Sequence, residues 1–286
     1  MALMMALGAL CSLVGAVASY GSRVKSGRNP ARPVGVGVAM LVAIALSAAS
    51  LWHVEGQSSG VSLAVYCIVG FNAASVALLW FIHSQRAPRG SCLRVAVGDE
   101  LPRFKATTAD GDVFDSASLR GQRILLKFYR GEWCPFCQAE LRRFEALRPR
   151  LEQAGIRIVA LSKDDQEAAH RHLLRDSLGF TLLCDPDLKV IRQFGLAHSK
   201  ALQVAGRARV RLFGLAVGLR PDFQSMAAPT TLLVDEQGRV CWVDQTDDYK
   251  VRSDEERVLA AVSDAFGSHL LPSQPNLVGL TRDGVV

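Results

Sequence analysis

The sequence predicts an α/β domain preceded by three transmembrane α-helices. Three long stretches near the N-terminus carry no charge, and residues 1–85 hold only four of the 33 Lys and Arg and one of the 27 Asp and Glu. After residue 85, short apolar runs alternate with amphipathic stretches, which is typical of an α/β sheet. The basic residues of this second part form no tract, so nucleic acid is not an expected partner.

The three uncharged stretches are residues 2–20, 34–52 and 61–82. Each is near the roughly 20 residues that a helix needs to cross about 30 Å of hydrocarbon, so a lipid bilayer is an expected partner. The first stretch is open to a second interpretation, a cleaved secretion signal ending near Ala16-Val17-Ala18. Because no Lys or Arg precedes this apolar run, a retained span is favoured.

Composition divides the chain into four expected segments. Pro88 and Gly90, set among three Arg, are typical of a linker rather than of a packed element. The expected segments are a membrane module at 1–85, a basic linker at 86–96, an α/β domain at 97–268 and a C-terminal tail at 269–286.

Basic residues indicate how the membrane module is oriented. Arg23, Lys25, Arg28 and Arg32 lie between the first two predicted spans and more Arg follow the third, whereas the connection 53–60 has no Lys or Arg. Short connections rich in Lys and Arg stay on the cytoplasmic side of a membrane. We therefore expect an integral membrane protein whose α/β domain faces the cytoplasm.

Each element of the α/β domain has its own signal in the sequence. Apolar runs predict strands, and an apolar period near 3.6 residues predicts helices. The expected strands are 124–129, 156–161, 180–183, 230–234 and 240–243, and the expected helices are 135–152, 164–178 and 254–266. Gly155 ends the first helix, Asp254 is the N-cap of the last, and the turn 235–238 joins the last two strands.

The segment FYRGEWCPFC, residues 128–137, follows a predicted strand and opens a predicted helix. Its two thiols, Cys134 and Cys137, are three positions apart and therefore face the same way on the helix. The unpaired amides and partial positive charge of a helix N-terminus stabilise a thiolate and lower its pKa. A nearby Arg130 would add to this effect, and a nearby Glu132 would oppose it.

Two structural alternatives exist for the thiol pair, half of a zinc site or two buried core thiols. A zinc site needs two more soft ligands, and the sequence has no second close Cys or Cys–His pair. A Cys-X-X-Cys sequence between a strand and a helix is typical of redox proteins. Neither a metal nor an organic cofactor is therefore expected.

The residues around the thiol pair resemble a known superfamily. The stretch from Glu132 to Cys137 is similar to the thioredoxin active site. The frame from Gly98-Asp99 through Leu119-Arg120-Gly121 to Phe128-Tyr129 resembles the peroxiredoxin-like branch, that of alkyl hydroperoxide reductase and thiol-specific antioxidant. The resemblance covers about residues 97–268. It implies a thioredoxin-like fold, in which helices flank a central mixed sheet.

The resemblance also implies further features of the site. Trp133 would shield the thiol pair. The stretch 228–235 is similar to the element that carries a cis proline opposite the thiols in thioredoxin-fold proteins, so Pro229 is an expected site residue with a cis bond. Thioredoxins hold a buried acid below the pair, and Lys127 and Phe128 occupy the nearest positions here.

Two chemistries fit the pair, and the peroxide-binding positions of the family separate them. Peroxiredoxins use Pro, Thr, the attacking Cys and a later Arg, and this sequence places Arg130, Cys134, Cys137 and Pro229 there, so three of the four differ. Thiol–disulfide exchange is therefore favoured. In that scheme Cys134, as the more exposed thiol, attacks a protein or small-molecule disulfide, and Cys137 resolves the mixed disulfide.

Two alternatives to thiol–disulfide exchange stay open. In a peroxiredoxin-like antioxidant peroxidase, Cys137 would attack a hydroperoxide and Cys134 would resolve. Either scheme needs a thiol electron donor. A catalytically inactive thioredoxin-fold interaction module is the second alternative, and the intact Cys pair argues against it.

Two further features of the sequence are weaker indications of function. His170 and His172 lie two apart on a predicted helix, so they point to different faces, and a solvated surface is the favoured interpretation for both. The insertion 199–225 interleaves Arg with apolar residues. It fits equally a helix on anionic lipid headgroups and a solvated excursion from the fold.

Overall fold

The computed structural model describes residues 1–25, 33–84, 92–203, 210–212, 215–217, 222–245 and 254–267. The chain forms two compact units, one containing the N-terminal helices and one containing the mixed sheet. Each unit has its own apolar clusters.

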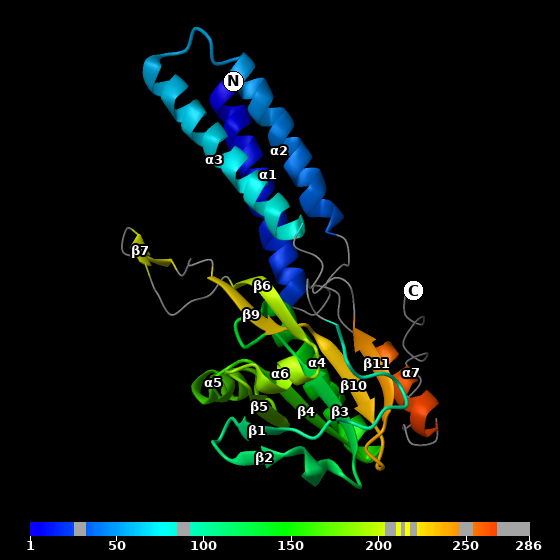
Figure 1. The fold of residues 1–286 in the computed structure, drawn as a ribbon. Helices are drawn as coiled ribbons and strands as arrows, with labels where there is room; N and C mark the ends of the chain where they lie inside the picture. The colour runs from blue at the N-terminus through cyan, green and yellow to red at the C-terminus, as the bar shows by residue number, and fades with distance from the viewer. Residues whose placement is uncertain are drawn as a thin grey trace, which may run out of the picture. The chain divides into compact units, whose positions relative to one another are not determined.

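The N-terminal unit is a bundle of three long helices, α1 (Ala2–Lys25), α2 (Val34–Trp52) and α3 (Ser59–Ser84) (Figure 1). Each holds a stretch that is long and apolar enough to cross a membrane, namely Ala2–Val24, Val34–Trp52 and Ser59–Phe81. The three stretches expected to be spans are therefore helices, and their length and composition suit membrane anchoring.

Asn72 of α3 connects the three helices. Its side chain is 1% exposed, and its Nδ2 donates to the carbonyl oxygen of Ala6 in α1 and to Oγ of Ser47 in α2, both at 3.3 Å. Ser50 Oγ in turn donates to the Ser47 carbonyl oxygen at 2.7 Å. Such bonds fix the register of apolar helices where the hydrophobic effect cannot.

The second unit is built on a mixed sheet of seven strands in the order β11-β10-β3-β4-β5-β1-β2, with β3 and β4 near its middle (Figure 1). Strands β3, β4 and β5 are parallel, and β10 runs antiparallel to β3. The strands are β1 (Lys105–Thr108), β2 (Val113–Asp115), β3 (Arg123–Phe128), β4 (Ile156–Ser162), β5 (Thr181–Cys184), β10 (Thr230–Val234) and β11 (Val240–Gln245).

In the described part of the chain five helices accompany the sheet, and an Asp side chain caps the start of three of them. Asp165 Oδ1 accepts from the Ala168 amide at 2.8 Å, and Asp254 Oδ1 accepts from the Arg257 amide at 2.9 Å, so the predicted cap at Asp254 is confirmed. The helices are η1 (Ser116–Leu119), α4 (Pro135–Gln153), α5 (Gln166–Asp176), α6 (Lys189–Gln193) and α7 (Glu255–Phe266).

The expected thioredoxin-like fold, a central mixed sheet flanked by helices, is confirmed by this topology. Every strand expected from an apolar run is present. The sequence did not predict β1, β2 or α6, because these elements are three to five residues long and too short to show a period.

The central strand β3 is buried on both faces, as expected for a strand with neighbours on each side. Ile124, Leu126 and Phe128 belong to a large apolar cluster on one face. In that cluster Phe194 packs against the Phe104 and Phe128 rings, with centroids 5.9 and 4.9 Å away. The opposite face presents the alternate residues Leu125, Lys127 and Tyr129, so β3 carries a charged side chain into the interior.

The insertion before Pro229 contains strands rather than the helix that was one of its two expected forms. Its described backbone forms β6 (Ala197–Gln203) paired with β9 (Asp222–Ala227), and β7 (Val210–Leu212) paired with β8 (Leu215–Val217). The expected contact with lipid headgroups would be made by the side chains of residues 199–224, and these side chains are outside the described part of the structure.

Candidate functional site

The two thiols lie in the first turn of α4, after the loop that leaves β3. Cys134 precedes Pro135, the first residue of α4, and its carbonyl oxygen accepts from the Gln138 amide at 3.0 Å. Cys137 is the third residue of the helix. The helix therefore begins where the sequence predicts, and its N-terminal partial charge favours a thiolate at this position.

Both thiols are buried. The side chains of Cys134 and Cys137 are 1% and 0% exposed, so Cys134, expected to be the more exposed of the two, differs little from Cys137 in exposure. In the loop before them, Tyr129, Arg130 and Gly131 are buried too. Trp133, expected to shield the pair, is half-buried.

The loop before the thiols is tied to the end of β4. The Glu132 amide donates to Asp164 Oδ2 at 2.8 Å, and Ser162 Oγ donates to the same oxygen at 2.8 Å. The Asp164 amide donates back to Ser162 Oγ at 3.1 Å. Asp164 is buried, so these bonds form where water competes poorly, and they fix the loop two residues before Cys134.

The negative charge of Glu132, which could have opposed thiolate formation, is paired with Arg175 of α5. Arg175 Nη1 lies 3.0 Å from Glu132 Oε2, and Nη2 donates to the Glu132 carbonyl oxygen at 3.2 Å. Arg171, one turn earlier, is 3.7 Å from the same carboxylate. The side chain of Glu132 is 22% exposed, so this pairing is only partly screened.

His172 lies behind this loop and is fully buried, so its predicted solvated position is wrong, while His170 is exposed as expected. The two histidines differ in exposure because residues two apart in the sequence lie on different faces of α5. His172 Nε2 is 3.1 Å from Asp176 Oδ2, and the ring meets Tyr129 edge-on with centroids 5.8 Å apart. Burial, and then the charge of Arg175, lower the pKa of His172 to about 4.

Arg130 lies at the base of the β6–β9 pair. It is 5% exposed, and its Nε donates to Met226 Sδ at 3.0 Å. His198 of β6 stands opposite Met226 in the strand register. Burial, and then the positive charge of Arg130, lower the pKa of His198 to about 4. The described contacts of Arg130 thus include this pair, which the sequence did not predict.

Pro229 lies at the start of β10, beside the end of β3, because Thr230 pairs with Phe128. Among the described residues no peptide bond is cis, so the Ala228–Pro229 bond is trans and the cis prediction is wrong. Trans is the ordinary state of an X-Pro bond, and the chain is held on both sides of this one, by the Ala228 amide donating to the Leu196 carbonyl oxygen at 2.7 Å and by Thr230 joining the sheet. Pro229 is a buried strand-entry proline.

Lys127 lies on β3, on the face opposite the large apolar cluster. It is 2% exposed, its Nζ donates to Thr231 Oγ1 at 3.0 Å, and it lies over the Phe144 ring of α4 at 5.9 Å from the centroid. Of the two residues nearest the position where thioredoxins hold a buried acid, Lys127 thus lies on this face of β3 and Phe128 on the other.

Cys184, the other buried thiol of the domain, is unsuited to reaction. Burial, and then the charge of Asp164, raise the pKa of Cys184 to about 12, so this thiol stays protonated. In the part of the chain that the structure describes, no three His, Cys, Asp or Glu side chains gather as metal ligands would.

Sequence reasoning missed Asp164, Arg175 and His172 as parts of the site. A signal existed for Asp164, which lies three residues after the end of the predicted strand 156–161. The carboxyl ends of adjacent parallel strands meet at one edge of a sheet, so this carboxylate is expected near the loop after β3. The two α5 residues had no such signal, because the face that a helix buries depends on packing.

Comparisons with known proteins cover the sheet and the loop that carries the thiols. Residues 97–243 match the AhpC/TSA family. The chain is 31% identical over 108 residues to the putative peroxiredoxin bcp of Coxiella burnetii, which covers 38% of this chain and 72% of that protein. It is 28% identical over 104 residues to the thiol-disulfide oxidoreductase ResA of Bacillus anthracis, covering 36% of this chain and 60% of that protein. The crystal structure of peroxidoxin BcpB from Mycobacterium tuberculosis is similar with a TM-score of 0.45 and 20% identity, over 59% of this chain and 96% of that one.

Proposed function

The chain belongs to the AhpC/TSA family, and from this premise we propose that it is a membrane-anchored thiol–disulfide oxidoreductase that works through Cys134 and Cys137. Its relatives are named as peroxiredoxins and thiol–disulfide oxidoreductases, so the chain is a redox enzyme of one of these two kinds. The choice between the two, the role of each thiol and the side of the membrane are our proposal.

One observation carries the choice: two thiols lie three residues apart in the first turn of α4. The Cys134 thiolate attacks one sulfur of a substrate disulfide, and the other sulfur leaves as a thiolate that takes up a proton. The Cys137 thiolate then attacks Cys134, forming the intramolecular disulfide and releasing the second substrate thiol. Two electrons pass from the dithiol to the substrate, and a thiol donor restores the pair.

The peroxide-binding positions of the family support this choice. A hydroxyl and a guanidinium normally hydrogen-bond and polarise the peroxide, and this chain has Cys134 and Pro229 in their places. Pro229 has neither a charge nor a backbone amide to donate. Without these donors, cleavage of the O–O bond loses its electrostatic assistance, whereas attack on a disulfide needs only a thiolate and a resolving thiol.

The ion pair of Glu132 with Arg175 supports a reactive Cys134. An unpaired carboxylate two residues before the thiol would raise the pKa of the thiol and lower the thiolate fraction. With its charge paired at 3.0 Å, the carboxylate opposes the helix N-terminus less. Arg175 is therefore a positioning residue for the loop and for its charge.

A peroxidase is the second candidate, favoured by the 31% identity to a putative peroxiredoxin. In this scheme the Cys137 thiolate attacks the peroxide, the alcohol or water leaves, and the resulting sulfenic acid condenses with Cys134 to a disulfide and water. The deep burial of both thiols suits a small substrate such as a hydroperoxide.

The side of the membrane is part of the proposal. Basic residues lie between the first two spans and follow the third, which favours a cytoplasmic redox domain, where a reducing pool would keep the dithiol available as an electron donor. Labelling of Cys134 by a membrane-impermeant maleimide in intact cells tests this side. The experiment needs a background in which the exposed cysteines are replaced by Ser. They are Cys11, Cys67 and Cys92. Labelling only after permeabilisation is expected, and equal labelling without it would contradict the proposed side.

The activity itself is tested with the full-length protein in lipid nanodiscs, by comparing reduction of insulin disulfides with consumption of hydroperoxide. The wild type is expected to reduce insulin faster than peroxide, and Cys134→Ser and Cys137→Ser are expected to lose turnover. Cys184→Ser, which removes an equally buried thiol, is the matched control and should keep it. Faster peroxide consumption would favour the second candidate, and no turnover on either would favour an interaction module.

A further inference from the structure

The α/β domain has a hollow of about 450 Å³ where the start of β1, η1 and α6 meet, called here the β1–α6 hollow. Lys105 begins β1, which runs antiparallel to β5, and α6 follows β5, so the hollow lies beyond the carboxyl end of β5. Ligands of open α/β sheets commonly bind outside the carboxyl ends of the strands. The lining residues are Arg103, Phe104, Lys105, Asp115, Ala117, Lys189, Val190 and Gln193.

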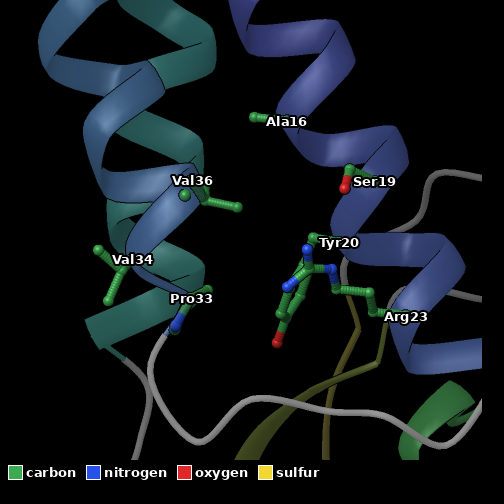
Figure 2. Close-up of a pocket in the computed structure, with 8 residues that line it drawn as sticks. Ala16, Ser19, Tyr20, Arg23, Pro33, Val34 and Val36 are labelled. Atoms are coloured by element: carbon green, nitrogen blue, oxygen red, sulfur yellow. The ribbon is translucent and has the colours of Figure 1, made fainter.

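Another hollow, of about 280 Å³, lies between α1 and α2 (Figure 2). Figure 2 shows Tyr20 and Arg23 on its α1 side, with Pro33 and Val34 on the α2 side. Tyr20 and Arg23 already have interactions within the protein, so the one charged side chain that lines this hollow is engaged. The charged side chains of the β1–α6 hollow are arranged differently.

Three cationic side chains and one carboxylate line the β1–α6 hollow. Lys105 Nζ lies 3.5 Å from Asp115 Oδ2, and Lys189 Nζ lies 3.1 Å from Asp187 Oδ2. The four side chains are between 43% and 80% exposed, and such pairs contribute little, so a bound anion can compete with them. Among the described residues, no carboxylate forms an ion pair with Arg103. Arg103 is therefore the cation of the hollow that most lacks a counter-charge.

Asp115 reduces the positive charge of the hollow without cancelling it. Its Oδ1 accepts from the Ala117 amide at 2.9 Å, and its Oδ2 is the atom that pairs with Lys105. The bond from Ala117, and then the charges of Lys105 and Arg103, lower the pKa of Asp115, so this carboxylate is ionised at neutral pH. One negative charge against three positive charges leaves the hollow cationic.

The β1–α6 hollow also has an apolar wall that is held in place. Phe104 and Val190 are 4% and 3% exposed, and the Phe104 ring packs edge-on against Phe194 with centroids 5.9 Å apart. Gln193 Nε2 donates to the Arg103 carbonyl oxygen at 2.9 Å, which ties α6 to the segment before β1. A ligand therefore meets walls that are already formed, and this lowers the ordering cost of binding.

We propose that the β1–α6 hollow binds a phosphate monoester with a small apolar body. The planar Arg103 guanidinium pairs with two phosphate oxygens, and Lys105 and Lys189 add their positive charge. The apolar body lies against Phe104 and Val190. A phosphate monoester carries about −1.5 to −2 charges at neutral pH, which suits three cations better than the single charge of a carboxylate does. The site is independent of the proposed redox function, since none of the thiols is among its lining residues.

Microscale thermophoresis of the full-length protein in phosphatidylcholine nanodiscs tests the site with three probes, phenyl phosphate, inorganic phosphate and benzoate. Phenyl phosphate is expected to bind saturably and about fivefold more tightly than either of the others, because it alone combines a phosphate with an apolar ring. Arg103→Gln should weaken its binding about tenfold, as expected for the loss of charge-assisted hydrogen bonds. The matched control is Arg192→Gln, which removes the same charge from an exposed residue of α6 that does not line the hollow. It should leave the affinity within about a factor of two of the wild type.

A second variant separates the hollow from surface charge. Ala117→Leu keeps every charge and places a larger side chain in the hollow, so it is expected to weaken phenyl phosphate binding as well; Ala117 is exposed, so the fold should tolerate the change. No saturable binding of phenyl phosphate, equal loss in the Arg103 and Arg192 variants, or unchanged binding in Ala117→Leu would overturn the proposal. Equal affinity for inorganic phosphate would overturn it in favour of a plain anion site, and equal affinity for benzoate in favour of a carboxylate site.

Discussion

Acid should destabilise the α/β domain through two buried histidines, His172 and His198. Both pKa values are lowered to about 4 in the folded protein, from 6.5 for an exposed imidazole, and burial is the main cause for each. The unfolded chain therefore binds protons more strongly than the folded one between pH 6.5 and 4. Folding stability is full above pH 6.5 and is lost progressively as the pH falls toward 4.

The size of the effect follows from these two pKa values. Between pH 7.5 and pH 5, one such histidine lowers the free energy of unfolding by about 2 kcal/mol, and two lower it by about 4 kcal/mol. This is a large part of the 5–15 kcal/mol that stabilises a typical domain. Asp176, beside His172, does not add to the loss in this range, because its pKa is lowered from 3.8.

The change that tests this reasoning is His172→Gln, which keeps a polar side chain but cannot take up a proton. The unfolding free energy of the α/β domain is measured by pulse proteolysis in urea, on the full-length protein in nanodiscs, at pH 7.5 and pH 5. The pH-dependent loss should fall from about 4 to about 2 kcal/mol. His170→Gln, at an exposed position of the same helix, is the control and should keep the full loss.

Other titrating groups cancel in this comparison, because they are present in both proteins. Asp185, whose pKa is raised by burial, acts in the opposite direction to the histidines and does so equally in the variant and the wild type. An unchanged loss in His172→Gln would refute the assignment of a buried neutral imidazole.

Two further predictions concern the loop and the core. Arg175→Gln removes the closer of two arginines that pair with the Glu132 carboxylate and should raise the pKa of the Cys134 thiol, seen as a shift to higher pH of its alkylation rate by iodoacetamide. Arg148→Gln, which removes an arginine paired elsewhere on α4, should leave that profile in place. Phe194→Ala removes a fully buried ring from the large apolar cluster and should cost about 3–5 kcal/mol of unfolding free energy in the same urea assay; a loss below about 1 kcal/mol would mean that the cluster repacks around the cavity.

The sequence predicts the fold well because its signals are local. Apolar runs, a glycine stop and the Asp254 cap each act within one element, so the helices and the main strands follow from them. The Cys pair is equally local, since its spacing and the following helix are adjacent in the chain. What could not be predicted depends on long-range packing.

Three outcomes illustrate that limit. The burial of His172 depends on which face of α5 meets the sheet, and the trans bond before Pro229 depends on hydrogen bonds to residues 30 or more positions away. The position of the loop before Cys134 depends on Asp164, from the end of a neighbouring strand. In each case a contact between residues distant in the sequence decides a feature that neighbouring residues cannot predict.

The roles of the two thiols are the centre of this account, and trapping tests them most directly. Full-length Cys137→Ser and Cys134→Ser are exposed in nanodiscs to a disulfide substrate and, separately, to hydroperoxide, and the adducts are located by mass spectrometry after proteolysis. A mixed disulfide is expected on Cys134 in the Cys137→Ser protein, because Cys134 can attack the substrate disulfide but no Cys137 thiol is present to resolve the product. Rapid formation of a sulfenic acid on Cys137 in the Cys134→Ser protein, with no mixed disulfide on Cys134, would contradict it and assign the chain to the peroxidases.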